Sequence, residues 1–219
     1  MKFTRDEIRK AMLLYAVTDR AWLHGRTLAE DVEKVLQNGA TFLQLREKDL
    51  DRETFLREAK QLKTLAARYG VPFVVNDAVD IALEAGADGV HVGQEDIAGK
   101  DVRAVIGPDM LLGISAHTVE EAVAAQAGGA DYIGVGAAFA TSTKDVDSIL
   151  TVAEYRAICD AVDIPVVAIG GIHAWNILDL RGSGVSGVAV ISAIFAQPDV
   201  GAATAALLPL ARELVENHG

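Results

Sequence analysis

FVVNDAVDIALEAGADGVHVGQED, residues 73–96, has the pattern of one complete strand–helix–strand unit. Two short apolar runs, 73–75 and 89–92, enclose a segment in which apolar residues recur at roughly helical spacing. Two parallel strands joined in this way point in the same direction, so the residues that follow them emerge at the same edge of the sheet. Those residues are Asn76 and Asp77 after the first strand and Gln94, Glu95 and Asp96 after the second.

Asp77 and Asp96 allow two interpretations. Carboxylates at one sheet edge can share a hard cation such as Mg²⁺, which takes oxygen ligands and usually keeps water or phosphate oxygens beside one or two carboxylates. Asp is also a common N-cap residue, so both side chains could instead only cap the helices that follow. The spacing alone does not decide between metal binding and capping.

The rest of the chain repeats this alternation of strand and helix. The further strands that we expect cover residues 13–17, 42–45, 110–114, 132–136, 166–169 and 187–191. The further helices begin near Thr4 and cover the segments around 28–36, 55–66, 102–106, 119–127, 152–161, 175–180 and 202–215. Two helix starts carry the capping-box pattern, in Thr4 with Glu7 and in Thr118 with Glu121.

Eight strands alternating with helices predict an α/β fold, a (β/α)₈ TIM barrel with a short N-terminal helix. The 219 residues show no linker or change in composition, so we expect residues 1–219 to form a single domain. An open doubly wound sheet is the lesser alternative, because no G-x-G-x-x-G pattern follows an early strand. Three segments also form a weak internal repeat, AGADGVHVG, GGADYIGVG and GSGVSGVAV.

Composition excludes several classes of protein. The net charge of −11 argues against a general nucleic-acid binder but leaves room for a local cationic pocket. Cys159 is the only cysteine, so the chain forms no intramolecular disulfide and no cysteine-cluster metal site. No stretch reaches the roughly 18–20 apolar residues of a membrane span. We therefore expect a cytoplasmic protein that binds neither nucleic acid nor membrane, and an anionic small-molecule substrate is not excluded.

Polar residues follow one expected strand after another. Active sites of such barrels lie at the carboxyl ends of the strands. Arg offers phosphate a planar bidentate contact and Lys a point charge, so three cations and two carboxylates around one mouth suit a polyphosphate with a divalent metal. The residues at these ends are Arg46 and Lys48, Asn76 and Asp77, Asp96, Ser115 and His117, Thr141, Thr143 and Lys144, Gly170 and Gly171, and Ser192.

Each group also has a plainer interpretation. Residues 46–49 could be a solvated charge run, and residues 141–143 ordinary loop polarity. Gly170 and Gly171 could form only a tight turn, or could leave backbone N–H groups free to bind phosphate at a helix N-terminus. Ser192 could merely cap the last turn, and His91 could be a packed or rim histidine.

Seven motifs together resemble the thiamine-phosphate synthase family over nearly the whole chain. They are YAVTDR at Tyr15, FLQLREKD at Phe42, VVND…GVHVGQED at Val74, LGISAHT at Leu112, TSTK at Thr141, AIGGI at Ala168 and VAVISAI at Val188. The resemblance implies a (β/α)₈ barrel that joins a hydroxymethylpyrimidine diphosphate to a thiazole phosphate, giving thiamine phosphate and diphosphate. It also implies that Mg²⁺ is the cofactor.

The resemblance further implies a role for each matching residue. The pyrimidine diphosphate would be held by Gln44, Arg46, Lys48, Asn76, Ser115 and Lys144, of which Arg46, Lys48 and Lys144 would stabilise the leaving diphosphate. The thiazole phosphate would be held by Thr141, Thr143, Gly171, Ile191 and Ser192. Mg²⁺ would be bound by Asp77 and Asp96. A dissociative step, with the thiazole nitrogen attacking second, would need no protein nucleophile.

Two residues depart from the family pattern. Ala137 and Ala140 stand where family members usually carry prolines beside the aromatic residue of this loop. Losing two fixed φ angles is expected to loosen the loop and to raise the entropy cost of closing it. A thiazole tautomerase-like paralogue and a non-catalytic regulator that binds thiazole phosphate remain as alternatives, and a homo-oligomer is left open.

Overall fold

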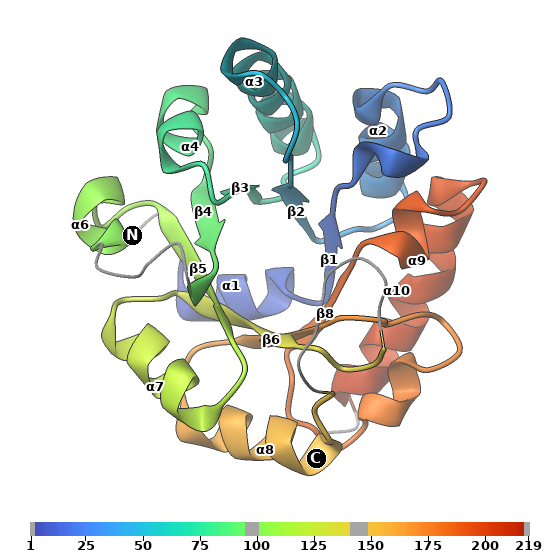
Figure 1. The fold of residues 1–219 in the computed structure, drawn as a ribbon. Helices are drawn as coiled ribbons and strands as arrows, with labels where there is room; N and C mark the ends of the chain where they lie inside the picture. The colour runs from blue at the N-terminus through green and yellow to red at the C-terminus, as the bar shows by residue number, and fades with distance from the viewer. Residues whose placement is uncertain (1–2, 95–100, 141–148, 217–219) are drawn as a thin grey trace.

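The structure is a computed structural model that describes residues 3–94, 101–140 and 149–216. Eight parallel strands follow one another in chain order and close into a barrel (Figure 1). The predicted fold class, a (β/α)₈ barrel rather than an open sheet, is confirmed. The strands are β1 (Leu14–Val17), β2 (Phe42–Leu45), β3 (Phe73–Asn76), β4 (Gly89–Val92), β5 (Leu111–Ala116), β6 (Tyr132–Gly136), β7 (Val166–Ile169) and β8 (Gly187–Val190).

Helices surround the barrel, as Figure 1 shows, and several begin with a side-chain cap. They are α1 (Arg5–Ala11), η1 (Arg20–Trp22), α2 (Leu28–Gln37), α3 (Arg52–Arg68), α4 (Val79–Ala85), α6 (Val102–Ile106), α7 (Val119–Ala127), α8 (Val152–Ala161), η2 (Ile177–Leu180), α9 (Ser192–Phe195) and α10 (Val200–Glu216). Complete capping boxes join Thr4 to Glu7, Thr27 to Glu30 and Thr151 to Glu154.

The capping box predicted for Thr118 and Glu121 forms only in part. The Thr118 side chain accepts a hydrogen bond from the Glu121 N–H. The Glu121 carboxylate does not return to the Thr118 backbone but accepts from the N–H of His117 at 2.7 Å and lies 3.0 Å from its Nδ1. His117 thus offers the carboxylate two donors, which replace the reciprocal bond of a capping box.

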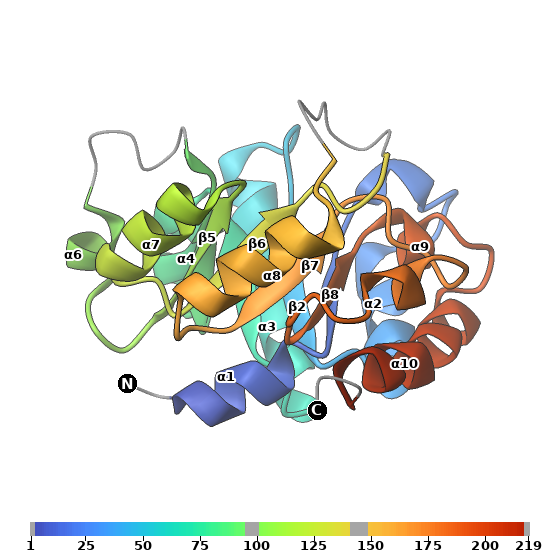
Figure 2. The ribbon, with the colours of Figure 1, turned by 90° about the horizontal axis from the view of Figure 1, so that it is seen from below.

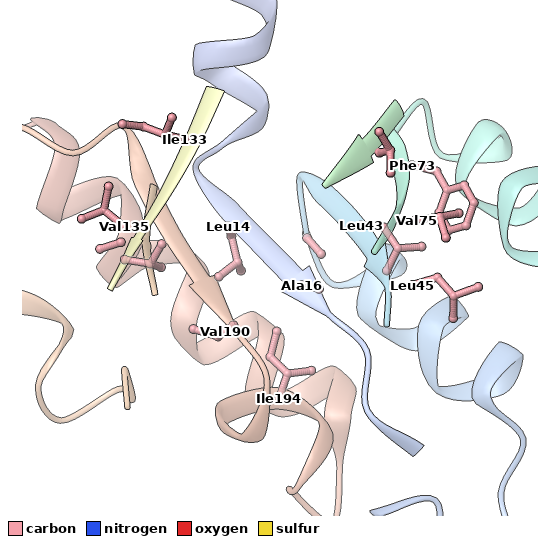
Figure 3. Packing of buried hydrophobic residues seen from close by; sticks show 14 of the residues in the cluster. Leu14, Ala16, Leu43, Leu45, Phe73, Val75, Ile133, Val135, Val190 and Ile194 are labelled. Carbon is pink, nitrogen blue, oxygen red and sulfur yellow. The ribbon is translucent and has the colours of Figure 1, made fainter. Parts of the chain in front are cut away.

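Side chains alternate between the two faces of each strand and so divide the core into two layers. The outward residues pack against the helices, among them Leu14 and Ala16 of β1 and Leu43 and Leu45 of β2 (Figure 3). The inward residues fill the barrel itself and include Tyr15, Phe42, Val74, Leu111, Tyr132, Val167 and Ala189. Both faces of the sheet are therefore buried, as expected for parallel strands covered by helices.

Helix α1 closes the amino-terminal end of the barrel. Ile8 and Met12 are 3% and 0% exposed and belong to the same cluster as the inward strand residues. Figure 2 shows α1 lying below the strands, across that end of the barrel. The interior is sealed there, so the opposite end is the one that is left for a ligand.

The internal repeat has a structural explanation at this closed end. In AGADGVHVG, Asp88 accepts hydrogen bonds from Lys63 Nζ at 2.6 Å and from the N–H of Phe73 at 3.0 Å. In GGADYIGVG, Asp131 accepts from Arg103 Nη2 at 2.7 Å and from the N–H of Leu112 at 2.8 Å. Each aspartate thus joins the start of one strand to a helix cation, and residues at this end of such barrels commonly serve stability.

Several boundaries differ from the sequence prediction, and those nearest the site are at the ends of β3, β5 and β8. Strand β5 continues to Ala116, so Ser115 lies within the strand rather than after it. Strand β8 ends at Val190, and Asn76 is the last residue of β3. The helix predicted over 175–180 forms only as the short 3₁₀ helix η2 over Ile177–Leu180, so its predicted start at Trp175 is wrong.

Asn176 explains why no α-helix starts at Trp175. Its side chain accepts from the His173 N–H at 2.7 Å and donates to the Gly171 carbonyl at 2.9 Å. Such local bonds from an Asn side chain compete with helical hydrogen bonding and favour a turn. Trp175 is left 78% exposed and stacks on His173 with ring centroids 4.1 Å apart.

Candidate active site

The carboxyl ends of the eight strands bring together most of the residues that the sequence predicts for the site. At this end lie Gln44, Arg46, Lys48, Asn76, Asp77, Ser115, Gly171, Ile191 and Ser192. Asp96, Thr141, Thr143 and Lys144 lie outside the described residues, so their predicted positions stay predictions. The described part of the site therefore consists of the ends of β2, β3, β5, β7 and β8.

Arg46 and Lys48 follow β2 and line a cavity beside the end of β1. The Arg46 N–H donates to Thr18 Oγ1 at 3.0 Å, and its guanidinium lies 3.5 Å from the Asp19 carboxylate. The cavity has a volume of about 330 Å³ and is bounded by residues 19–22 and 46–49. Two cations at a cavity of this size could receive an anionic group of a small ligand.

Glu47 lies between these two cations in sequence but points into the protein. Its side chain is 2% exposed, and Arg20 Nε donates to it at 2.7 Å. The other arm of Arg20, Nη2, donates to Glu58 of α3 at 2.7 Å. Burial raises the pKa of Glu58 above its ordinary value. The interpretation of residues 46–49 as a wholly solvated charge run is therefore wrong for Glu47.

The sequence motifs contained Arg20 and Glu47, but no role was predicted for either. A signal was present, since Arg20 follows β1 and Glu47 follows β2, and neighbouring parallel strands end at the same edge. Their pairing fixes one residue of the loop between two predicted diphosphate ligands. Arg20 also lines the cavity beside Arg46 and Lys48, and its pairing with Glu47 ties this loop to the segment after β1.

Asp77 is not a helix cap. The N-cap of α4 is Ala78, which forms no side-chain cap, so the capping alternative for Asp77 is wrong. Its side chain accepts a hydrogen bond from the Asn76 amide, and its backbone N–H donates to the His91 carbonyl at 2.9 Å. The carboxylate is exposed at the barrel mouth and offers the hard oxygen donors that Mg²⁺ takes.

Gln44 and Ser115 face the barrel interior and are connected by a chain of hydrogen bonds. Gln44 Nε2 donates to the Tyr15 hydroxyl at 2.5 Å, and the hydroxyls of Tyr15 and Tyr132 lie 2.9 Å apart. His91 lies between the Tyr132 hydroxyl, 3.2 Å from Nδ1, and the Ser115 hydroxyl, 3.1 Å from Nε2. We refer to these five residues as the inner hydrogen-bond chain.

The tyrosines of the inner hydrogen-bond chain keep their protons. Burial raises the pKa of the Tyr15 hydroxyl and that of the Tyr132 hydroxyl above the ordinary value. His91 is 8% exposed, so it is the packed histidine that one interpretation of the sequence expected. The sequence prediction did not include Tyr15, Tyr132 or His91 in the site, although period-2 alternation could have put all three on the inward face.

Gly170 and Gly171 serve the close approach of two loops. Both have positive φ, 103° and 64°. A Cβ on Gly170 would lie 2.8 Å from Ala137 Cβ, and one on Gly171 would lie 2.4 Å from the Ala140 carbonyl oxygen. Positive φ and these close approaches account for glycine at both positions, whereas phosphate binding by their N–H groups stays a prediction. The helix N-terminus proposed after them is wrong, because the next element, η2, begins only at Ile177.

The residues after β6 and β8 complete the described mouth. Ala138 and Phe139 donate backbone hydrogen bonds to the carbonyls of Ile169 and Gly170, both at 2.9 Å. The predicted loosening of the following loop by Ala137 and Ala140 stays a prediction, because residues 141–148 are outside the described ranges. Ser192 is the first residue of α9, whose N-cap is Ile191 without a side-chain bond, so the Ser192 capping alternative is wrong.

The described residues lack a metal-binding cluster of three and a membrane-spanning helix. In residues 3–94, 101–140 and 149–216, no three His, Cys, Asp or Glu side chains form a group that could hold a metal ion. The metal pair predicted from Asp77 and Asp96 stays a prediction, because Asp96 lies outside these ranges. Within the same ranges, no helix combines the length and the apolar character needed to cross a bilayer.

Comparisons with known proteins agree on one family. A family model described as thiamine monophosphate synthase matches residues 14–194. Thiamine-phosphate synthase of Ruminiclostridium cellulolyticum is 47% identical over 197 residues, 90% of this chain and 94% of the relative. Thiamine-phosphate synthase of Shouchella clausii is 44% identical over 205 residues, 93% of this chain and 98% of the relative.

A solved structure agrees with these relatives. Thiamine phosphate pyrophosphorylase from Pyrococcus furiosus has a TM-score of 0.86 to this structure at 37% identity, over 95% of this chain and 99% of that one. The family predicted from the sequence motifs is confirmed by the family model, by both relatives and by this structure. The chain is an enzyme that belongs to the thiamine monophosphate synthase family.

Proposed function

We propose that this enzyme joins 4-amino-2-methyl-5-(diphosphooxymethyl)pyrimidine to 4-methyl-5-(2-phosphoethyl)thiazole, giving thiamine phosphate and diphosphate in a Mg²⁺-dependent reaction. The observation that carries this proposal is the gathering of Arg46, Lys48, Asn76, Asp77 and Ser115 at the open end of the barrel. Cations, a carboxylate and neutral hydrogen-bonding groups at one mouth suit a diphosphate attached to a polar ring. We also propose that residues 1–219 act as one domain.

In this proposal Asp77 and Asp96 hold Mg²⁺. The Asp77 carboxylate fits such a role, because it is exposed at the mouth and helix α4 does not use it as a cap. A bound divalent cation would lower the energy of the negative charge that develops on the leaving diphosphate. The Asn76 amide, which donates to the Asp77 carboxylate, holds that carboxylate in one orientation.

The protein side chains stabilise the leaving group and orient the pyrimidine. The C–O bond of the methylene breaks first, its electron pair leaves with the diphosphate, and the electron-rich aminopyrimidine carries the positive charge. Arg46, Lys48 and Lys144 stabilise the departing diphosphate, which is the catalytic role assigned to them. Gln44, Asn76 and Ser115 hold the ring, and the thiazole nitrogen then forms the new C–N bond with its lone pair. No protein nucleophile takes part.

The second substrate binds at the other side of the mouth. Thr141 and Thr143 on the loop after β6, with Gly171, Ile191 and Ser192 after β7 and β8, hold the thiazole phosphate. The close packing of Gly170 and Gly171 on residues 137–140 supports this assignment, since it keeps the two loops adjacent at their bases. We propose that both substrates therefore enter one cavity from neighbouring parts of its rim.

Diphosphate release by the purified protein tests this function. The assay contains both substrates and Mg²⁺, and is repeated with EDTA and with each substrate omitted. Release that needs both substrates and the metal, together with thiamine phosphate formation, is the expected result. Binding of the thiazole phosphate without turnover would overturn the synthase and favour the tautomerase-like or regulatory alternative. Light scattering in the same preparation measures whether the enzyme is a homo-oligomer.

A further inference from the structure

The inner hydrogen-bond chain crosses the barrel from β2 to β5. Three of its five side chains, those of Tyr15, Tyr132 and His91, have no role in the proposed reaction. It begins at Gln44 on β2, passes through Tyr15 on β1, Tyr132 on β6 and His91 on β4, and ends at Ser115 on β5. Gln44 and Ser115 are both residues of the proposed pyrimidine pocket. The three residues between them lie deeper in the barrel, where Tyr15 and Tyr132 are 1% and 0% exposed.

One order of proton donors gives every hydroxyl and ring nitrogen along this chain a partner, with the Gln44 amide oriented as in the structure. Gln44 Nε2 donates to the Tyr15 oxygen, and in this order the Tyr15 proton is directed to Tyr132. The Tyr132 proton is then directed to His91 Nδ1, which must be unprotonated to accept it. A neutral imidazole carries its proton on the other nitrogen, so His91 Nε2–H donates to Ser115 Oγ.

This order of hydrogen-bond donors determines which groups Ser115 and Gln44, at the two ends of the inner hydrogen-bond chain, can offer a ligand. Ser115 Oγ already accepts from His91, so its own proton is free to be donated toward the mouth. The Gln44 amide uses its nitrogen on Tyr15, so its carbonyl oxygen remains as an acceptor. An aminopyrimidine ring has both complementary groups, since its ring nitrogens accept hydrogen bonds and its amino group donates them.

Two glycines leave space inside the barrel for His91 and Tyr132 of the inner hydrogen-bond chain. A Cβ on Gly113 would lie 2.3 Å from Tyr132 Cζ and 2.4 Å from His91 Nδ1. A Cβ on Gly134 would lie 3.2 Å from His91 Cε1. Real Cβ atoms do not approach other atoms as closely as the first two distances, so residue 113 must lack a side chain for the His91 and Tyr132 rings to meet.

We propose that Tyr15, Tyr132 and His91 are positioning residues that fix Ser115 as a hydrogen-bond donor and Gln44 as an acceptor for the aminopyrimidine ring. This inference rests on the proposed function, because it assumes that Gln44 and Ser115 contact that ring. None of the three touches a reacting atom. Their effect is on which ring binds and how it is oriented.

A pair of tyrosine variants separates positioning from simple stability. Tyr132→Phe removes one link of the chain, and Tyr155→Phe removes a buried hydroxyl that donates to the Val135 carbonyl at 2.9 Å outside it. Thermal unfolding should change to a similar extent in both. Tyr132→Phe should raise KM for the pyrimidine diphosphate roughly five- to tenfold and leave KM for the thiazole phosphate unchanged, which is the loss of about one hydrogen bond. Equal kinetics in the two variants would overturn the proposal.

His91 provides a rescue experiment and a spectroscopic one. A Gln side chain carries both a donor and an acceptor, so His91→Gln should retain most of the pyrimidine affinity, whereas His91→Leu should lose it. In ¹⁵N-histidine-labelled protein, the His91 resonances should report the neutral Nε2–H tautomer, assigned by their disappearance in His91→Gln. Failure of Gln to rescue, or a proton on Nδ1, would contradict the donor order.

Calorimetric binding of the pyrimidine diphosphate distinguishes this proposal from the proposed function. If the wild-type protein binds it without turnover and Tyr132→Phe weakens binding, the positioning role stands and the synthase proposal fails. If the wild-type protein turns over and Tyr132→Phe binds as tightly as wild type, the synthase stands and the positioning role fails. If the wild-type protein does not bind this molecule at all, both are overturned.

Discussion

Asp77 holds a backbone conformation that most residues avoid. Its φ is 60°, in the left-handed region where a non-glycine residue costs of the order of 1–3 kcal/mol. Asp and Asn tolerate this region better than other residues with a Cβ. The fold keeps Asp77 there through the hydrogen bond from its N–H to the His91 carbonyl. Such local strain in a barrel-mouth carboxylate is consistent with the metal-binding role that we propose.

The substitution Asp77→Asn tests that role without changing the backbone preference. It removes the charge that would attract Mg²⁺, so we expect turnover to fall about 100-fold or more and the remaining activity to need higher Mg²⁺. The control is Asp80→Asn on the exposed first turn of α4. Steady-state rates over a Mg²⁺ titration measure both. Unchanged activity in Asp77→Asn, with the same Mg²⁺ dependence, would contradict the metal assignment.

Arg20 is a second residue with a testable role. Arg20→Gln leaves the Glu47 carboxylate, whose side chain is 2% exposed, without its cation. We expect the free energy of unfolding to fall by roughly 1–3 kcal/mol, and KM for the pyrimidine diphosphate to rise as the loop with Arg46 and Lys48 loses its anchor. Urea unfolding and steady-state kinetics provide the two measurements.

Arg52 offers a matched control for Arg20. It also bridges two carboxylates, Asp80 and Glu84, at 3.1 and 2.7 Å, but all three side chains are well exposed. Exposed ion pairs contribute about 0–1 kcal/mol, so Arg52→Gln should change stability little and kinetics not at all. If Arg20→Gln behaved in the same way, the buried pair would have no role in holding the loop.

At the scale of elements, three helices depend on capping boxes that titrate. In α8 the Glu154 carboxylate accepts from the Thr151 N–H and hydroxyl, both at 2.7 Å. The backbone hydrogen bond from Thr151, with its side-chain bond second, lowers the pKa of Glu154. The boxes at Glu7 and Glu30 have lowered pKa values for the same reason.

The pH dependence of stability follows from this direction. A carboxyl group with a lowered pKa in the folded state stabilises the fold above its ordinary pKa of about 4.5 and loses this contribution as the pH falls through its folded pKa. The wild-type free energy of unfolding should thus decrease below about pH 4.5 more steeply than that of Glu154→Gln, which cannot titrate there. Urea unfolding between pH 3 and 7 measures the difference. Parallel curves for the two proteins would exclude a contribution from this box.

At the scale of the whole molecule, the barrel interior has room for the His91 and Tyr132 rings because Gly113 lacks a side chain, and Gly134 lies close to the same His91 ring. Gly113→Ala would bring a Cβ to 2.3 Å from Tyr132 Cζ, whereas Gly134→Ala would bring one to 3.2 Å from His91 Cε1. Overpacking costs about 1–3 kcal/mol, so we expect Gly113→Ala to fall at the upper end of this range or beyond it and Gly134→Ala to cost less. Urea unfolding measures which variant loses more free energy of unfolding. A larger loss in Gly134→Ala than in Gly113→Ala would refute this account of the packing.

Periodicity and turn residues determined most of the fold from the sequence. The bounds of β2, β4, β6 and β7, and of α6, α7 and α8, are those that the apolar spacing predicted. Most of these elements are short, but Gly, Pro or a capping residue lies at the ends of nearly all of them, as at Gly89 of β4 and at Thr118 and Gly128 around α7. The positions of Gln44, Arg46 and Asn76 at strand ends follow from the same pattern, because parallel strands all end at one edge.

The sequence was less informative in two places, for different reasons. Residues 175–180 are apolar enough to suggest a helix, but the Asn176 side chain bonds to the backbone of His173 and Gly171 before it. Ser115 was expected to follow β5, yet the barrel extends that strand through backbone pairing with β6. At Ser115 the neighbouring strand in space decided the conformation, whereas at Asn176 a side-chain bond to nearby residues in the sequence did.

The sequence by itself thus determined the family, the barrel and the end of the barrel at which the predicted site residues gather. Only the tertiary structure decided that Arg20 pairs with Glu47, that Gly171 packs on Ala140, and that Gln44 and Ser115 are joined through the barrel interior. The physical reason is that periodicity fixes which face of an element a side chain occupies. Contacts across a closed barrel depend instead on strand register and side-chain volume, which no single segment specifies.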